Sequence, residues 1–138
     1  MAIQPNGRRV LVVEDSEVIR RVLSLILQGE GYQVAQADGG HAALALARQT
    51  HLDAVTLDLS LPDLDGREVL RKLKEDPRTR AIPVVVISAF PEGLTDVERR
   101  LAAQVIVKPF DVDDLLASVG RAVSGAAPPA QPSAWYVN

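Results

Sequence analysis

Five side chains that could do acid, hydroxyl or amine chemistry stand at the ends of short apolar runs. They are Glu14 and Asp15 after "VLVV", Asp58 in "AVTLDL", Ser88 in "VVVIS" and Lys108 after "QVIV". Each alone has an ordinary explanation, because a single polar residue at such a place is usually a turn former, a helix cap or a surface group. Their joint occurrence at four apolar runs indicates a functional site.

The three acidic residues of this set need positive charge nearby if they share one crevice. At about 4 Å and an effective dielectric of about 20, each pair of like charges costs on the order of 4 kcal/mol. Lys108 offsets one charge, and the remaining excess suits a hard, oxygen-seeking divalent ion such as Mg²⁺. Zinc is not favoured, because the chain has no cysteine and both histidines, His41 and His51, are predicted to lie on the surface.

The strands that position these residues follow from the apolar pattern. The four runs are nearly continuous and rich in β-branched residues, which is typical of strands buried on both faces of a parallel sheet. A further run, "YQVAQA", alternates and is predicted to be a strand nearer the edge. The predicted strands are 10–13, 32–37, 54–59, 84–88 and 104–107.

Segments with helical periodicity lie between and after the strands. Their apolar faces are predicted to hold Ile19, Val22, Leu23 and Ile26; Ala43, Leu44 and Ala47; Val69, Leu70 and Leu73; part of "EGLTDVERRLAA"; and Val112, Leu115, Leu116 and Val119. This alternation predicts a doubly wound α/β fold, a parallel sheet with helices on both faces. Ligands bind outside the carboxyl ends of such strands, so the first and third strands should bring their acidic residues into one crevice.

Length and charge narrow the classes of function. The 138 residues are enough for one globular domain, and the formal net charge of −3 offers no basic excess for nucleic acid. No apolar stretch is long enough for a signal sequence or a membrane span, and the absence of cysteine fits a reducing compartment, so a cytoplasmic location is predicted. The Ala/Pro-rich residues 124–138 are predicted to be a flexible tail or linker after a domain at 8–123.

These motifs resemble those of a response-regulator receiver domain, the phosphorylatable module of two-component signalling, over about residues 8–123. The matching stretches are "VLVVED", "DLSLPDLDG", "IPVVVISA" and "VKPF". The resemblance implies a flavodoxin-like, five-stranded parallel sheet of order 2-1-3-4-5. It also implies that Asp58 accepts a phosphoryl group from a histidine kinase, a phosphotransfer protein or a small phosphodonor. A carboxylate can act as such a nucleophile when its charge is offset.

The resemblance assigns roles to the remaining site residues as well. Mg²⁺ would be bound by Glu14, Asp15, Asp58 and the backbone carbonyl of Ser60. Lys108 would pair with one phosphoryl oxygen, and the Ser88 hydroxyl would bind another as the expected switch. The peptide bond before Pro109 is a candidate cis bond.

Two features depart from the family pattern. Receivers usually carry Tyr or Phe three residues before the lysine, where this chain has Val105, so a switch by an inward-swinging aromatic is not expected. The segment between Ser88 and Lys108 is also slightly short, which predicts a shortened or irregular fourth helix. Ser60 and Phe90, beside the expected path of the hydrolytic water, offer no carboxylate or amide to orient it. A long-lived phosphorylated form is therefore predicted.

Two other classes of function stay open from the sequence. One is a receiver-like interaction module that is not phosphorylated, and the other is an aspartate-nucleophile phosphatase. A phosphatase of the haloacid dehalogenase type would need an acid at position 60, which is Ser60 here. The leading interpretation is a signalling domain that is no enzyme beyond catalysing its own phosphorylation and dephosphorylation. Its downstream effector, its pathway and the existence of a homodimer are not determined by the sequence.

Overall fold

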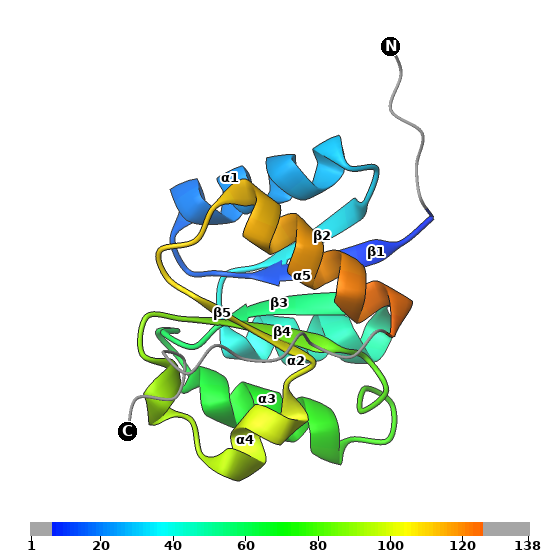
Figure 1. The fold of residues 1–138 in the computed structure, drawn as a ribbon. Helices are drawn as coiled ribbons and strands as arrows, with labels where there is room; N and C mark the ends of the chain where they lie inside the picture. The colour runs from blue at the N-terminus through cyan, green and yellow to red at the C-terminus, as the bar shows by residue number, and fades with distance from the viewer. Residues whose placement is uncertain (1–6, 126–138) are drawn as a thin grey trace.

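The structure, a computed structural model, describes residues 7–125, so nearly all of the predicted tail lies outside the described residues. Within them, one five-stranded parallel sheet has the order β2-β1-β3-β4-β5, which confirms the predicted topology (Figure 1). The strands are β1 (Arg9–Val13), β2 (Gln33–Ala37), β3 (Ala54–Asp58), β4 (Val84–Ser88) and β5 (Gln104–Val107). The alternating strand β2 lies at the edge of the sheet, as predicted.

Helices cover both faces of the sheet, with α1 and α5 on one side and α2, α3 and α4 on the other (Figure 1). Their bounds are α1 (Glu17–Gly29), α2 (Gly40–Gln49), α3 (Gly66–Glu75), α4 (Asp96–Leu101) and α5 (Val112–Ser124). A short 3₁₀ turn, η1 (Pro91–Gly93), precedes α4. The predicted shortening of the fourth helix is confirmed, because α4 has only six residues.

Two apolar cores lie on opposite sides of the sheet, and they explain the continuous strand patterns. Val10 and Val12 of β1 pack with the α1 and α5 side chains, whereas Leu11 and Val13 pack with those of α2 and α3. Successive residues of a strand point to opposite faces. A strand covered on both faces therefore needs mostly apolar side chains until it leaves the core, although β3 also buries Thr56.

The buried face of α1 differs from the predicted one. Leu23 and Leu27 are buried, but Ile19 is 44% exposed and Val22 is 49% exposed. The buried stripe also contains Ser24, whose hydroxyl donates to the Arg20 carbonyl 2.7 Å away. That bond satisfies the hydroxyl inside the helix, which allows a polar residue to occupy a core position.

The loop from β3 to α3 is fixed by its own polar residues and by a close backbone approach. Asp63 accepts hydrogen bonds from the backbone N–H groups of Gly40 and His41, so it ties the loop to the start of α2. Asp65 is the N-cap of α3. A Cβ at Gly66 would lie 2.4 Å from the Leu59 Cα, so only glycine fits there. The loop is therefore held rigidly beside the carboxyl end of β3.

Candidate functional site

Three polar side chains are buried where the central strands end. Glu14, directly after β1, is 3% exposed; Asp58, the last residue of β3, is 5% exposed; and Ser88, the last residue of β4, is 7% exposed. The strands are in register here, with Val13 opposite Leu57 and Asp58 opposite Ile87. Buried acidic groups are rare unless they are paired, so this edge of the sheet has the character of a functional site.

Asp58 is held at both of its carboxylate oxygens. Lys108, just past β5, places its Nζ 2.5 Å from Asp58 Oδ2. The backbone N–H of Ser60 donates to Asp58 Oδ1 at 2.8 Å. Lys108 is anchored in turn, because its backbone N–H donates to the Ser88 carbonyl at 2.9 Å and its peptide bond to Pro109 is cis, the isomer that the resemblance implies.

The carboxyls of Glu14 and Asp58 respond to each other with opposite pKa shifts. Burial, together with a hydrogen bond to Asp58, raises the pKa of Glu14 from 4.5 to about 7. Burial alone would also raise the pKa of Asp58, but hydrogen bonds to Glu14, Lys108 and Ser60 outweigh it and lower that pKa below 3.8. Near neutral pH the pair therefore carries an ionised Asp58 and a Glu14 close to its midpoint.

The donor atoms present suit a hard divalent ion. The Glu14 and Asp58 carboxyl groups lie within hydrogen-bonding reach of each other, so their two negative charges need a nearby proton or cation. Asp15 is exposed beside them and offers a third carboxylate. Within residues 7–125, no three acidic or histidine side chains already converge on a single point. Mg²⁺ is usually held by one or two carboxylates and several waters.

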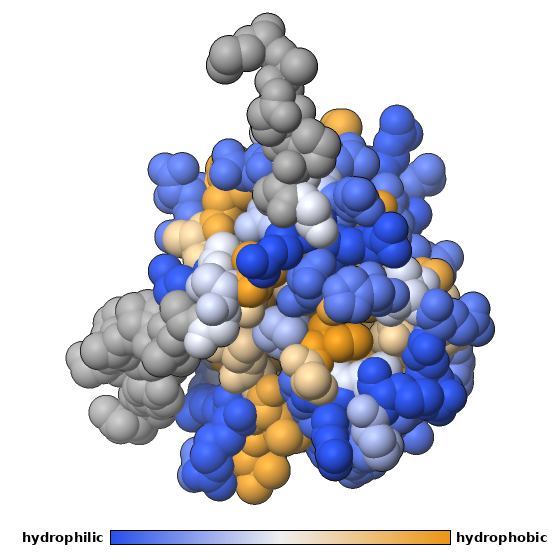
Figure 2. All heavy atoms as spheres, turned by 90° about the vertical axis from the view of Figure 1, so that its right-hand side faces the viewer, coloured by the Kyte–Doolittle hydropathy of each residue, from blue (hydrophilic) through white to orange (hydrophobic). Residues whose placement is uncertain are grey.

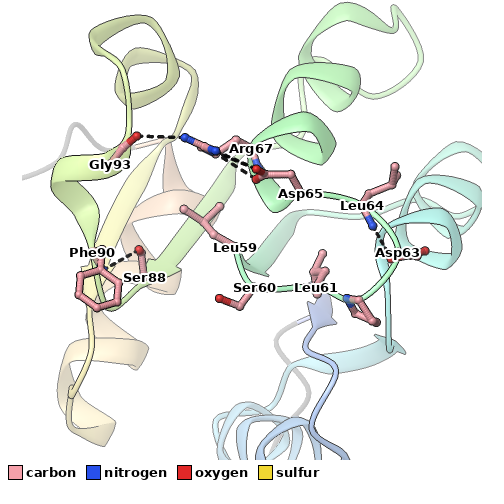
Figure 3. A pocket seen from close by; sticks show the side chains of 11 residues that line it. Leu59, Ser60, Leu61, Asp63, Leu64, Asp65, Arg67, Ser88, Phe90 and Gly93 are labelled. Carbon is pink, nitrogen blue, oxygen red and sulfur yellow. Dashed lines mark hydrogen bonds and ion pairs between the residues drawn. The ribbon is translucent and has the colours of Figure 1, made fainter.

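Ser88 and Phe90 form the start of the segment opposite the β3–α3 loop. The Ser88 hydroxyl accepts a hydrogen bond from the Phe90 backbone N–H at 3.0 Å, and the Phe90 ring is 72% exposed (Figure 3). A crevice of about 580 Å³ separates this segment from the loop, and Ser60 and Arg67 also line it. The crevice lies next to Asp58, because Leu59 and Ser60, which follow it, line one wall.

Several other predicted residues have plain structural positions. Val105 is partly buried and packs against the core on the α3 side of the sheet. His41 and His51 are exposed, as predicted. The cap of α1 is Ser16 rather than Asp15, because the Ser16 hydroxyl accepts from the Ile19 N–H. Asp15 is thereby left available to the site.

The opposite end of the sheet carries none of the predicted site residues. Figure 2 shows the molecule from the side of the strands' amino ends, where hydrophilic side chains surround scattered apolar patches. A crevice of about 780 Å³ lies at that end, lined partly by Arg48, His51 and Asp53. Although this crevice is larger, the buried acidic pair lies at the carboxyl ends, so the chemistry is assigned there.

Sequence reasoning missed a set of polar contacts between α3 and the residues around α4. Arg67 and Arg71 of α3 reach Gly93 and Glu98, respectively. The stretch "TDVE" does match a capping box, and Thr95 and Glu98 form one. That signal could have located the start of α4, but nothing in the sequence showed that Glu98 is buried or which arginine pairs with it.

Comparison with known proteins identifies the class of protein to which this chain belongs. The response regulator receiver domain family matches residues 10–120, and the chain belongs to this family. It is therefore a receiver domain of two-component signalling. No helix within residues 7–125 is long and apolar enough to cross a membrane.

Individual relatives agree with this assignment. The chain is 34% identical over 119 residues to protein PilH of Pseudomonas aeruginosa, covering 85% of this chain and 98% of PilH. It is 43% identical over 114 residues to the response regulator PleD of Caulobacter vibrioides, covering 80% of this chain but only 25% of PleD.

Solved structures of response regulators also agree with the assignment to the receiver family. The chemotaxis response regulator CheY4 of Vibrio cholerae is 30% identical, with a TM-score of 0.75 and coverage of 83% of this chain and 98% of CheY4. TrrA of Thermotoga maritima, solved in complex with Mg²⁺ and BeF, is also 30% identical. Its TM-score is 0.76, with coverage of 83% of this chain and 98% of TrrA.

Proposed function

We propose that this receiver accepts a phosphoryl group on Asp58 and changes its binding to a partner as a result. The observation that carries the proposal is the buried Asp58 carboxylate, which is kept ionised while Lys108 lies 2.5 Å from Oδ2. An ionised carboxylate is a nucleophile, and a fixed ammonium group beside it can offset charge that develops on a phosphoryl oxygen.

Transfer of the phosphoryl group to Asp58 is a displacement at phosphorus. An Asp58 oxygen forms a bond to phosphorus while the bond from phosphorus to the donor breaks, and the electron pair of that bond leaves with the donor. The donor is a phosphohistidine of a histidine kinase or phosphotransfer protein, or a small acyl phosphate. Lys108 then pairs with a phosphoryl oxygen, and the Ser88 hydroxyl donates to another.

Mg²⁺ is the cofactor that this chemistry requires, and the donor set fits it. Glu14, Asp15, Asp58 and the backbone carbonyl of Ser60 would hold the ion, which supplies charge neutralisation during phosphoryl transfer. Two observations support the assignment: the buried Glu14 and Asp58 carboxyl groups lie side by side, and the related TrrA was solved with Mg²⁺ and BeF.

The wider role follows from the receiver class. Residues 8–123 form the signalling domain, and the domain works in the cytoplasm. It turns over no separate substrate. Its output is a change in affinity for a protein partner, and it does not contact nucleic acid directly, since the net charge of −3 offers no basic excess.

Phosphorylation by acetyl phosphate with Mg²⁺ tests the proposal, with intact-protein mass as the readout. The wild-type chain should gain one phosphoryl group only when Mg²⁺ is present, and Asp58→Asn should gain none. Asp63→Asn is the matched control, because Asp63 lies on the same loop but binds the start of α2. Labelling of Asp58→Asn equal to wild type would refute the assignment. Sustained hydrolysis of a separate phosphate ester would favour a phosphatase, and no Mg²⁺-dependent response would favour a non-phosphorylated module.

A further inference from the structure

The strongest unexplained feature is the set of arginine contacts on residues 90–101, here called the α4 segment. This segment begins two residues after Ser88 and contains η1 and α4. Arg67 Nη1 donates to the Gly93 carbonyl at 3.3 Å (Figure 3), and Arg99 Nη2 donates to the Pro91 carbonyl at 2.9 Å. Arg71 forms an ion pair with Glu98.

Arg67 is well placed to link the two walls of the crevice. Its Nη2 lies 2.8 Å from Asp65 Oδ2 and its Nε lies 3.2 Å from Asp65 Oδ1, so the guanidinium is held on the side of the β3–α3 loop. Asp65 is itself fixed as the cap of α3. Arg67 Nη1, which donates to the Gly93 carbonyl, therefore ties the α4 segment to the rigid β3–α3 loop.

Glu98 makes the position of α4 depend on a second arginine. It is the residue of α4 that is buried, at 3% exposed, and its other carboxylate oxygen accepts from the Thr95 N–H at 2.9 Å. A buried carboxylate is tolerated only when it is paired. The Arg71–Glu98 pair therefore helps to hold α4 against α3, together with the apolar contacts of Leu94 and Leu101. A six-residue helix with so few buried apolar residues is an element that can open locally.

Ser88 connects this arrangement to the phosphoacceptor. Its hydroxyl oxygen now accepts from the Phe90 N–H at 3.0 Å (Figure 3). When the hydroxyl turns toward a phosphoryl group on Asp58, the Phe90 N–H must follow it or lose its acceptor. If the N–H follows, the start of the α4 segment is displaced, which Arg67 resists at Gly93; if it does not, the segment loses one of the contacts that fix its start. The two interactions therefore compete.

We propose that Arg67 and Arg71 are positioning residues that hold the α4 segment in its unphosphorylated place, and that phosphorylation at Asp58 releases it. This inference rests on the proposed function. It also identifies a route for the signal in a chain that has Val105 at the position of the usual aromatic switch.

Thermodynamic linkage gives the proposal a measurable consequence. If phosphorylation weakens the arginine contacts, then weakening those contacts must favour the phosphorylated form by the same factor. Arg67 is 43% exposed, so solvent reduces the strength of its bonds. For a half-exposed pair we expect a change of about two- to five-fold.

The test uses the full chain with Mg²⁺ and beryllofluoride, a phosphoryl mimic, and measures both binding affinity and amide hydrogen exchange of the α4 segment. In the wild type, binding should speed exchange there. Arg67→Ala should bind beryllofluoride about two- to five-fold more tightly than the wild type. Its α4 segment should exchange amide hydrogens faster than that of the wild type before binding, and the further increase on binding should be smaller. Arg67→Lys, which keeps the charge but loses the forked geometry, should lie between the two. Lys72→Ala, on the same helix but paired with Glu68 at 3.9 Å, should match the wild type.

The possible results distinguish failure of the arginine coupling from failure of the proposed function. Arg67→Ala with wild-type affinity and the wild-type exchange response would overturn the coupling, as would tighter binding by Lys72→Ala to the same extent. Binding by the wild type without any exchange response in the α4 segment would also overturn it, while leaving Asp58 as the acceptor. A wild-type chain that binds no beryllofluoride would refute the proposed function itself, and the coupling with it.

Discussion

Glu14 should make the Mg²⁺-free protein less stable as the pH rises through neutrality. Its pKa is raised from 4.5 to about 7 in the folded chain, because it is buried and hydrogen bonded to Asp58. Between these values the folded state holds a proton that the unfolded state has released. The free energy of unfolding therefore falls with rising pH over this range and levels off above it.

The size of the effect follows from the same values. A pKa raised from 4.5 to about 7 corresponds to roughly 3 kcal/mol of stability that is present at low pH and lost at high pH. Asp58 does not obscure this, because its pKa lies below 3.8 and it titrates in a more acidic range. Glu14→Gln removes the titrating group but keeps an oxygen that can accept from the Ser16 N–H.

The test is urea unfolding followed by circular dichroism, with a chelator present and at several pH values from about 5 to about 8. It measures the difference in the free energy of unfolding between Glu14→Gln and wild type. The variant should gain up to about 3 kcal/mol relative to wild type across this range. The comparison at each pH cancels every other titrating group. Asp58→Asn should reduce the pH dependence, since it removes the partner that raises the pKa of Glu14. Parallel curves for Glu14→Gln and wild type would refute the reasoning.

Two shorter predictions concern the loops beside the site. Gly66→Ala should destabilise the fold by about 2 kcal/mol or more, because its Cβ would lie 2.4 Å from the Leu59 Cα, whereas Gly29→Ala meets no atom within 4 Å and should be neutral or slightly stabilising in the same denaturation assay. The phosphorylated chain should lose phosphate over minutes or longer without a phosphatase, because Ser60 and Phe90 offer no carboxylate or amide to orient water, and Phe90→Glu should shorten that time. A wild-type half-life of a few seconds, measured by intact mass, would contradict the second prediction.

The sequence was sufficient to predict the sheet and the approach of Glu14 and Lys108 to Asp58. Strands buried on both faces need mostly apolar side chains, so the first acidic residue after such an apolar run marks the strand end, as at Asp58. Parallel strands in a known order then place those ends together. Periodicity was less reliable for α1, where Ile19 and Val22 remain exposed and Ser24 is buried. The Ser24 hydroxyl is satisfied by its own helix, so residue polarity alone did not mark the buried face.

The contacts around α4 could not be predicted for a different physical reason. Arg67 and Gly93 are 26 residues apart, and Arg71 and Glu98 are 27 residues apart. Charged residues at such separations have many alternative partners, and the choice depends on the orientation of two helices. An apolar pattern carries no information about it.

The strands and the α4 segment differ in predictability because different kinds of interaction hold them in place. The strands that carry Glu14, Asp58 and Ser88 are fixed by close-packed apolar side chains, which give little when one charge is added nearby. The α4 segment is attached to α3 partly through charged and backbone hydrogen bonds, whose energies change when a neighbouring donor or acceptor turns away. If Asp58 is phosphorylated as proposed, the phosphoryl group should therefore leave the sheet in place and act on the polar contacts that begin at Ser88. The signal should emerge at the edge formed by α3 and α4, and an effector that senses it should lose sensitivity when Arg67 is replaced.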